Sequence, residues 1–387
     1  MPVEKCLRLA VLGHTIASPD NRMRWKRLAE MYGSSEVTLL PPAKYSSGGA
    51  QGQSQMWVAE RRSEGNYTEL PVEFGKGWFV TLPYYKGMRA RLQHIGPNVV
   101  YAIGEVFNPI VAQAAVASKF LQPRPKLVFH VNHNIPYELH RLRHKIYEKC
   151  VFRCSAGAVA ENTTAAEILK HRGFSKPVLI QAAPGASEAC FRPSDKVAAR
   201  ASIGLATNAF VVGFVGGFRP EKGVPDLAAA FAALPRDAVL LLVGDGPLRS
   251  EIEAHARSLG VMERVVMAGF VPRSETPRLY QAMDVLVLPS RSSAKVAEQF
   301  GNVLAEAMLC GTAVVGSTCG AIPEVIGEAG LVFPEGDVDT LAKSLRKLRD
   351  EPAFRQSLAE RGLRRALEEY SASALSRRFH DFCASLL

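Results

Sequence analysis

Two glutamates, Glu298 and Glu306, offer the clearest chemistry in the sequence, because seven residues separate them across a predicted junction of loop and helix. Gly301 lets the backbone approach a ligand and begin a helix whose first N–H groups lack intrahelical acceptors and suit hydroxyl or phosphate oxygens. Glu298 then lies at the mouth of that helix. Glu306 lies within it among apolar residues, where an unpaired carboxylate would cost about 2–7 kcal/mol. Glu306 therefore needs donors from a ligand or from a neighbouring lysine, or else an exposed place on the helix.

The segment VVGFVGGFRPEKGV, residues 211–224, predicts a strand, a glycine-rich turn and a helix that begins near Val224. Lys222 stands beside the start of that helix, where an ammonium group and backbone N–H groups favour a diphosphate. Arg219 offers a guanidinium fork that suits phosphate. The glycines do not form the G-x-G-x-x-G pattern of dinucleotide-binding proteins. A solvated lysine in a turn is the alternative for Lys222.

Histidines and other polar residues follow predicted strands of the first half. His133 comes after the buried run Lys126–Val131 and precedes Asn134, so a neutral imidazole there could bind a ligand oxygen. A structural role is the alternative. His140 and His144 share a helix face and could bind a metal, but no H-E-x-x-H motif or nearby cysteine supports one.

The loop after the first predicted strand offers further ligand contacts. Gly13 and His14 follow that strand directly, and Arg22 and Arg24 stand behind them as candidate contacts to an acceptor. Glu105 ends another strand. Glu105 and Asn134 are further candidate contacts to an acceptor. The alternative for Glu105 is a helix cap or an exposed acid.

The chain has 387 residues, 47% of them hydrophobic, and a net charge of +10. This charge attracts acidic partners: nucleic acid, an anionic membrane or a nucleotide diphosphate. No nucleic-acid-binding module is recognisable, so nucleic acid is not expected. Trp78 and Phe79, with Tyr84 and Tyr85, stand near Lys76, Lys86, Arg89 and Arg91, and this grouping favours an anionic membrane surface as a partner. A solvated helix face beside a buried strand is the alternative.

Apolar runs are too short to cross a bilayer, and charged residues interrupt any N-terminal signal peptide. Seven cysteines without a C-x2-C pair indicate reduced thiols rather than a disulfide framework. We therefore expect a cytoplasmic protein, peripheral to the inner face of the membrane if it meets one.

Apolar runs alternate with helical patterns in both halves, which predicts α/β domains with parallel sheets. The segment 183–195 carries prolines and glycine without helical periodicity and reads as a linker. Ligands of such sheets bind outside the carboxyl ends of the strands. Predicted strands are Leu7–Leu12, Val37–Leu40, Val99–Ile103, Lys126–Val131, Ala156–Ala160 and Val178–Ala182 in the first half, and Phe210–Val215, Val239–Val243, Val265–Ala268, Val285–Leu288, Ala313–Gly316 and Leu331–Phe333 in the second.

Four segments in order, VGGFRPEKGV, VGDGPLRSEIE, AGFVPRSETPRLYQAMDVLVLPS and EQFGNVLAEAMLCGTAVVGSTCGAIPEVIGEAGLVFPEGD, resemble the donor half of a GT4-type retaining glycosyltransferase (glycosyl transferases group 1) with the GT-B fold. This resemblance implies two Rossmann-like doubly wound domains facing across a cleft: residues 1–190 for the acceptor, residues 191–369 for the donor, and a helix over 370–387 that returns to the first domain.

The resemblance also implies the substrates: a nucleotide-diphosphate sugar, expected to be a UDP- or GDP-sugar, and a sugar, glycolipid or other hydroxyl acceptor. The reaction would be a metal-independent hexosyl transfer with retention of configuration, without a cofactor, in polysaccharide, glycolipid or other glycoconjugate synthesis. A phosphorylase or epimerase of the same fold, or an inactive nucleotide-sugar-binding protein, remains an alternative.

The resemblance further implies roles for single residues. Glu298, His133 and Lys222 would be catalytic, with Glu298 on the sugar hydroxyls and Lys222 on the diphosphate, while Glu306 would bind ribose. The family often has arginine where this chain has Gly217, so Arg219 would substitute for it. The remaining donor contacts would be Gly13, Val271 in the loop that borders the base, Phe300, Gly301, Asn302 and Val303.

Overall fold

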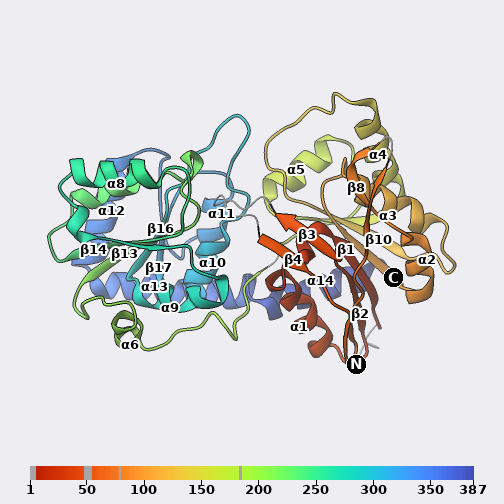
Figure 1. Cartoon of the computed structure of the whole chain (residues 1–387), viewed down its shortest axis with the longest axis horizontal. Helices are drawn as coiled ribbons and strands as arrows, with labels where there is room; N and C mark the ends of the chain where they lie inside the picture. Colours follow the sequence, from red (N-terminus) through yellow and green to blue (C-terminus); the bar gives the residue numbers. More distant parts are fainter. Residues whose placement is uncertain (1–5, 48–54, 78–79, 183–184) are drawn as a thin grey trace. The chain divides into compact units, whose positions relative to one another are not determined.

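The computed structural model describes residues 6–47, 55–77, 80–182 and 185–387, and the chain forms two compact units (Figure 1). Unit 1 holds the described residues up to 182 together with Ala372–Leu387. Unit 2 holds Gly185–Ser371. These limits lie a few residues from the boundaries expected at 190/191 and 369/370. Trp78 and Phe79, which suggested a membrane surface, lie outside the described residues.

Unit 1 is built on an eight-stranded sheet in the order β12-β11-β10-β9-β1-β2-β6-β5. All neighbours pair in parallel except β5, which pairs antiparallel with β6. Two antiparallel pairs, β3 with β4 and β7 with β8, stand apart from this sheet. The strands are β1 (Arg8–Gly13), β2 (Glu36–Leu40), β3 (Lys44–Ser47), β4 (Gln55–Val58), β5 (Arg62–Glu64), β6 (Tyr67–Glu69), β7 (Phe74–Gly77), β8 (Val80–Tyr85), β9 (Val99–Ile103), β10 (Lys126–Val131), β11 (Ser155–Ala160) and β12 (Val178–Ile180).

Helices cover both faces of this sheet because its central strands are apolar on both sides. One core joins the sheet to α2, α3, α4 and α5, and the other joins it to α1 and α14. Trp25 of α1 and Phe379 of α14 pack edge to face at 5.2 Å in the second core. The helices are α1 (Met23–Met31), α2 (Met88–Ile95), α3 (Pro109–Lys119), α4 (Leu142–Cys154), α5 (Thr163–His171) and α14 (Ala372–Leu386).

Unit 2 has a six-stranded, fully parallel sheet in the order β15-β14-β13-β16-β17-β18. Its strands are β13 (Phe210–Val215), β14 (Ala238–Val243), β15 (Val265–Gly269), β16 (Val285–Leu288), β17 (Ala313–Ser317) and β18 (Leu331–Phe333). Its helices are α6 (Lys196–Ala201), α7 (Val224–Ala232), α8 (Arg249–Ser258), α9 (Thr276–Ala282), α10 (Asn302–Leu309), α11 (Ile322–Ile326), α12 (Val338–Asp350) and α13 (Pro352–Glu369).

The predicted parallel strands are all present, and Phe210–Val215, Val285–Leu288 and Leu331–Phe333 have the predicted bounds. The short strands between β3 and β8 were not predicted. Most are only three or four residues long, and some are polar, as in Arg62–Glu64, so they lack the longer apolar runs that marked the others. The sequence therefore identified the central strands of the two sheets and missed the strands at the edge of the first sheet and outside it.

The strand order places the topological switch of unit 2 between β13 and β16, which are direct neighbours although two strands separate them in the chain. Chains leave such neighbouring parallel strands in opposite directions, which opens a crevice at their carboxyl ends. The loop after β13 carries Lys222, and the loop after β16 carries Glu298. The fold thus brings these two loops to one edge of the sheet.

Asp284, directly before β16, fixes this part of the sheet from within the core. Its carboxylate accepts from the Val211 N–H at 2.8 Å, from Arg200 at 2.6 Å and from Lys196 at 3.1 Å. Burial alone would raise the pKa of Asp284, but Lys196, the Val211 N–H and Arg200 together hold that pKa below its usual value. The network ties β16 to β13 and α6.

We expect Asp284→Ala to lower the free energy of unfolding of unit 2 by about 3–5 kcal/mol, because the buried guanidinium of Arg200 loses its carboxylate partner. Hydrogen exchange of the β13 amides in urea measures this. In the wild type, the contribution should be lost as the pH falls through the lowered pKa, since the folded state holds the ionised form. Asp350→Ala is the control, since Asp350 forms an exposed ion pair with Arg349 that should contribute at most about 1 kcal/mol. Equal losses in the two variants would contradict the network's role.

Candidate functional site

Lys222 and Glu298 form an ion pair, with Lys222 Nζ 2.7 Å from Glu298 Oε2. The Ser290 hydroxyl donates to the same oxygen at 2.9 Å. The side chains of Lys222 and Glu298 are 21% and 13% exposed, so both are largely withdrawn from solvent but reachable. The two residues expected to be catalytic in this half therefore meet, although 76 positions separate them in the chain.

The two loops that carry this pair are fastened to each other. Gly223, beside Lys222, has φ +62°, and a Cβ there would collide with the Pro289 carbonyl, so only glycine allows this approach. Arg291 then bonds both carboxylate oxygens of Asp226 at 2.6 Å. The Arg291 N–H also donates to the Glu221 carbonyl at 2.9 Å. The geometry of the pair is thus set by the backbone and by a bidentate clamp.

Contacts to its backbone also hold Glu298. Its N–H donates to Cys319 Sγ at 3.4 Å, and its carbonyl accepts from the Ala321 N–H at 2.9 Å. Cys319 is completely buried. The carboxylate therefore extends from an anchored segment that links the β16 loop to the loop after β17.

The helix that follows Glu298 begins at Asn302, with Gly301 as N-cap at φ +82°. Phe300 is buried and packs edge to face on Tyr370 at 5.2 Å. Asn302 is exposed and Val303 is half-buried. Because first-turn N–H groups have no intrahelical acceptors, this end of α10 can bind hydroxyl or phosphate oxygens through the backbone.

Glu306 is buried in α10 and already has donors from the protein. Arg273 Nε lies 2.8 Å from Oε1, and the Tyr280 hydroxyl donates to Oε2 at 2.7 Å. Burial and the neighbouring Glu306 raise the pKa of Tyr280 well above its usual value. The sequence-based view that ligand hydroxyls or a lysine must satisfy Glu306 was incomplete, because an arginine and a tyrosine do so. A carboxylate has about four acceptor positions, so it can still accept from a ligand.

The remaining predicted donor contacts of unit 2 lie in two loops. Arg219 is 40% exposed and its Nε lies 3.1 Å from a Glu221 carboxylate oxygen. Gly217 precedes it in the loop after β13, and the Gly217 carbonyl accepts from the Arg219 N–H at 3.0 Å. Val271 is half-buried in the loop after β15, beside Arg273, which reaches Glu306. The ion pair of Arg273 and Glu306 therefore links the loop expected to border the base to the residue expected to bind ribose.

The predicted residues of unit 1 gather at the carboxyl ends of β1, β9 and β10. Gly13 ends β1, and its N–H donates to the Tyr85 hydroxyl at 3.1 Å. His14 is half-buried, and burial lowers its pKa. The Glu105 carboxylate accepts from the His133 N–H at 3.0 Å, which gives Glu105 a role in shaping that loop. Burial raises the pKa of Glu105, and the Asn132 and His133 N–H groups oppose this rise.

The loop after β10 places the His133 ring 5.0 Å from the Tyr137 ring, edge to face. His133 and Asn134 are both half-buried. The imidazole is thus held by a ring contact and by its own anchored backbone. It remains a candidate ligand contact within unit 1.

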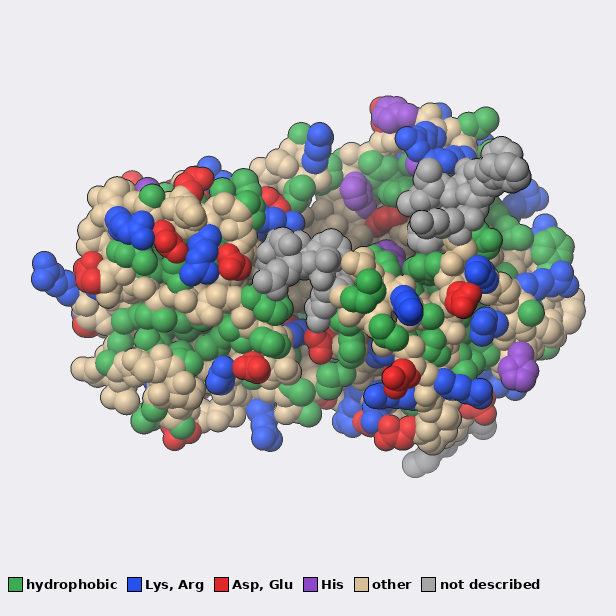
Figure 2. Space-filling model, in the orientation of Figure 1, with side chains coloured by type: hydrophobic (Ala, Val, Ile, Leu, Met, Phe, Trp, Pro, Cys, Tyr) green, Lys and Arg blue, Asp and Glu red, His purple; other side chains and the backbone are tan. Residues whose placement is uncertain are grey.

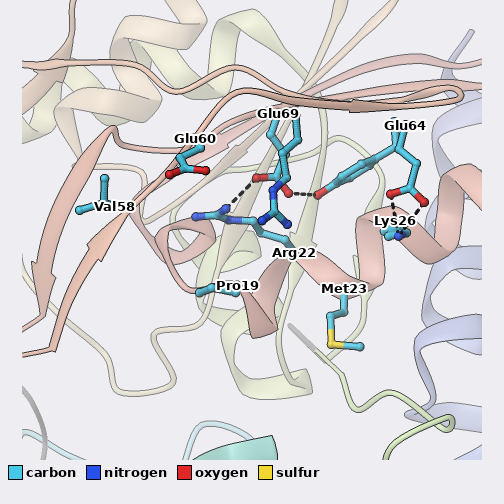
Figure 3. Close-up of a pocket in the computed structure, with 10 residues that line it drawn as sticks. Pro19, Arg22, Met23, Lys26, Val58, Glu60, Glu64 and Glu69 are labelled. Atoms are coloured by element: carbon cyan, nitrogen blue, oxygen red, sulfur yellow. Dashed lines mark hydrogen bonds and ion pairs between the residues drawn. The ribbon is translucent and has the colours of Figure 1, made fainter.

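Arg22 lies at one side of a cavity of about 510 Å³ between α1 and the strands β4 to β6 (Figure 3). Its guanidinium is 2.7 Å from Glu69 Oε2, and Glu69 accepts from the Tyr67 hydroxyl at 2.7 Å (Figure 3). Arg22 also donates to the Ile16 and Ala17 carbonyls at 2.8 and 2.6 Å. Arg22 therefore fastens the loop after β1 to β6 and borders the cavity that this loop helps to form.

Arg24 occupies a different environment. It is 3% exposed, and its guanidinium lies 4.6 Å from the Trp25 ring centroid and 5.3 Å from that of Phe379. Burial lowers its pKa to about 10. The structure gives Arg24 a packing role between α1 and α14 in place of the expected acceptor contact. The sequence did not reveal this because the covering helix is about 350 residues away in the chain.

The family model "Glycosyl transferases group 1" matches residues 195–365, which lie within unit 2 and include Lys222, Glu298 and Glu306. A 2-deoxystreptamine glucosyltransferase from Streptomyces kanamyceticus is 38% identical over 148 residues, or 37% of each chain. A D-inositol 3-phosphate glycosyltransferase from Rhodococcus opacus is 34% identical over 238 residues, covering 57% of this chain and 52% of the relative. The chain thus spans only between about a third and a half of the length of the curated relatives it matches.

Among solved structures, Anabaena Alr3699/HepE in complex with UDP-glucose is similar, with a TM-score of 0.69 and 20% identity over 97% of this chain and 99% of that one. Likeness at this identity concerns the fold. The expected fold class, GT-B with two Rossmann-like doubly wound domains, is confirmed.

We expect Glu306→Gln to fold normally, because the amide oxygen still accepts one donor, and to bind UDP about fivefold more weakly. A hydrogen bond from ribose to a charged acceptor contributes about 1 kcal/mol more than one to a neutral acceptor. Titration calorimetry with UDP measures the affinity, and thermal unfolding reports the fold. The matched control is Glu328→Gln, on an exposed glutamate of the same unit. Unchanged UDP affinity in a folded Glu306→Gln protein would leave Glu306 with a structural role only.

Proposed function

We propose that this protein moves a hexosyl group from a nucleotide-diphosphate sugar to a hydroxyl acceptor, with retention of configuration and without a metal, because residues 195–365 match the family model of glycosyl transferases group 1. The ion pair of Lys222 and Glu298 at the switch point of the unit 2 sheet carries the proposal. A cation that suits phosphate and an anion that suits sugar hydroxyls lie at neighbouring strand ends, and α/β sheets commonly bind ligands there, which supports the proposal.

Lys222 serves the leaving diphosphate. Its ammonium group has three donors, of which Glu298 takes one in the structure. The others can bind phosphate oxygens as negative charge builds on the departing diphosphate. Arg219 and the N-terminus of α10 add further positive potential. The Glu298 carboxylate both holds Lys222 and accepts from the sugar hydroxyls.

In the reaction, the bond between the anomeric carbon and the phosphate oxygen breaks, and the acceptor oxygen bonds to the anomeric carbon on the same face. The acceptor proton passes to the released diphosphate. No side chain needs to form a covalent intermediate in this scheme. The contribution of the protein is electrostatic stabilisation and positioning, which together can lower a barrier by several kcal/mol.

UDP-glucose is the first donor to test, since the similar Anabaena protein was solved in complex with it; GDP-sugars remain in the comparison. The two relatives are named for 2-deoxystreptamine and D-inositol 3-phosphate. Such polyhydroxylated rings are the first acceptors to test, beside simple sugars and glycolipids. We propose that His14, His133 and Asn134 contact the acceptor or the transferred sugar, and that the Arg22 cavity receives part of the acceptor.

Within the described residues, no helix is long and apolar enough to span a membrane. All seven cysteines are free thiols. Free thiols fit a reducing compartment, so we propose that the protein works in the cytoplasm.

The donor class is tested by thermal unfolding with UDP, GDP and ADP. The correct diphosphate at 100 times its dissociation constant should add about 2.7 kcal/mol of stability. Transfer from UDP-glucose is then followed with myo-inositol, D-inositol 3-phosphate and 2-deoxystreptamine, and proton NMR gives the anomeric configuration of the product. Cleavage that requires inorganic phosphate would indicate a phosphorylase, and an inverted product would contradict retention.

We expect Lys222→Ala to weaken UDP binding by about 10- to 150-fold while uridine binding stays within about twofold. A hydrogen-bonded ion pair to phosphate contributes about 1.5–3 kcal/mol, and uridine has no phosphate. Titration calorimetry with both ligands measures the difference. Lys343→Ala is the control, on an exposed lysine of α12. Equal losses for UDP and uridine would remove Lys222 from the phosphate site.

A further inference from the structure

The surface of α4 in unit 1 has a composition that the proposed transfer reaction does not use. Leu142 is 73% exposed and Ile146 is 56% exposed. They stand four positions apart on one helix, so their side chains share one face. Lys149 and Arg153 continue the same exposed line along the helix, at the spacings expected for one face. We call this line of four residues the α4 stripe.

Cations flank the α4 stripe. Arg141 and Lys145 are also exposed and stand beside its aliphatic half. Within the described part of the chain, none of the exposed cations of this helix forms an ion pair with a carboxylate. The only acid of α4 is Glu148, which is 12% exposed and turned to Arg172 at 2.5 Å.

The helix is anchored on its opposite side, so the stripe does not belong to the core. Val151 is completely buried, and Lys176 donates to the Phe152 carbonyl at 2.8 Å near the end of the helix. Figure 1 places α4 beside α3 at the surface of the unit, and Figure 2 shows blue Lys and Arg side chains over that region. Burial, Arg143 and Arg141 lower the pKa of His144, which fits a positive potential here.

The neighbouring helix repeats this combination of apolar and basic groups. Phe120, at the end of α3, is 54% exposed. The guanidinium of Arg89 lies 5.8 Å from its ring centroid and Lys119 Nζ lies 6.0 Å from it. Because α3 packs on α4, two adjacent helices expose apolar side chains among cations.

We propose that the α4 stripe docks the protein on an anionic lipid bilayer. Leu142 and Ile146 would enter the boundary between headgroups and acyl chains, while Lys145, Lys149 and the neighbouring arginines meet lipid phosphates. Cations near an anionic leaflet and a few inserted aliphatic side chains together give reversible binding of this kind. The combination fits a bilayer better than RNA, because single-stranded RNA is bound by aromatic stacking rather than by exposed aliphatic groups.

The test is sedimentation of the full chain with vesicles of phosphatidylcholine alone or with 30% phosphatidylglycerol, at roughly 0.1 M and 0.5 M salt. We expect binding only to the anionic vesicles and a loss of binding at high salt. Lys145→Glu with Lys149→Glu should weaken binding by about 30-fold or more, since each cation near the surface contributes about fivefold. Leu142→Ser with Ile146→Ser should weaken it by about tenfold or more.

Matched controls are Lys343→Glu with Arg346→Glu, which reverses two exposed cations of α12, and Val197→Ser, which removes an apolar side chain that is 56% exposed on α6. Unchanged thermal unfolding and UDP affinity show that all variants fold. The proposal is overturned if the wild type does not bind anionic vesicles or if the α4 variants bind them as well as the wild type. It is also overturned if the α12 control loses as much vesicle affinity as the α4 lysine variant. It is also overturned if the α4 variants lose only affinity for a 20-nucleotide RNA and keep vesicle binding.

Discussion

The ion pair between Lys222 and Glu298 is the interaction on which the proposed donor site depends. A parallel sheet whose strand order reverses between β13 and β16 brings their loops together. Glycine at position 223 then lets one loop touch the other, and the Asp226–Arg291 clamp holds both. Each charge stabilises the other, and in the proposed reaction Lys222 would bind the diphosphate and Glu298 the sugar. The pair thus keeps two partly buried charges compatible with a stable fold.

The second constraint is the burial of Glu306. Arg273 and the Tyr280 hydroxyl both donate to its carboxylate inside the helix. Arg273 comes from the loop expected to border the base. The position of that loop is therefore coupled to the orientation of the Glu306 carboxylate. A nucleotide that bonds to Glu306 therefore meets a carboxylate whose orientation is already fixed, which reduces the entropy lost on binding.

Much of this could be predicted from the sequence. Apolar runs identified the parallel strands, and glycines and loop positions identified the segments that carry Lys222 and Glu298. The partners of these side chains could not be predicted, because Lys222 and Glu298, or Arg273 and Glu306, meet only after the chain has folded. For the same reason the burial of Arg24 beneath α14 was missed. The strands from β3 to β8 were missed because most of them are too short to show a periodic pattern that separates a strand from a loop.

The most direct test of the account is a comparison of binding and turnover in Glu298→Gln. The amide oxygen can still accept from Lys222, so the affinity for UDP, measured by calorimetry, should stay within about threefold of the wild type. Turnover with the sugar donor should fall by about 10- to 150-fold, because a charged hydrogen bond to a sugar hydroxyl contributes about 1.5–3 kcal/mol to the transition state. Full turnover, or a loss of UDP affinity equal to the loss of turnover, would contradict the claim that Glu298 holds the transferred sugar.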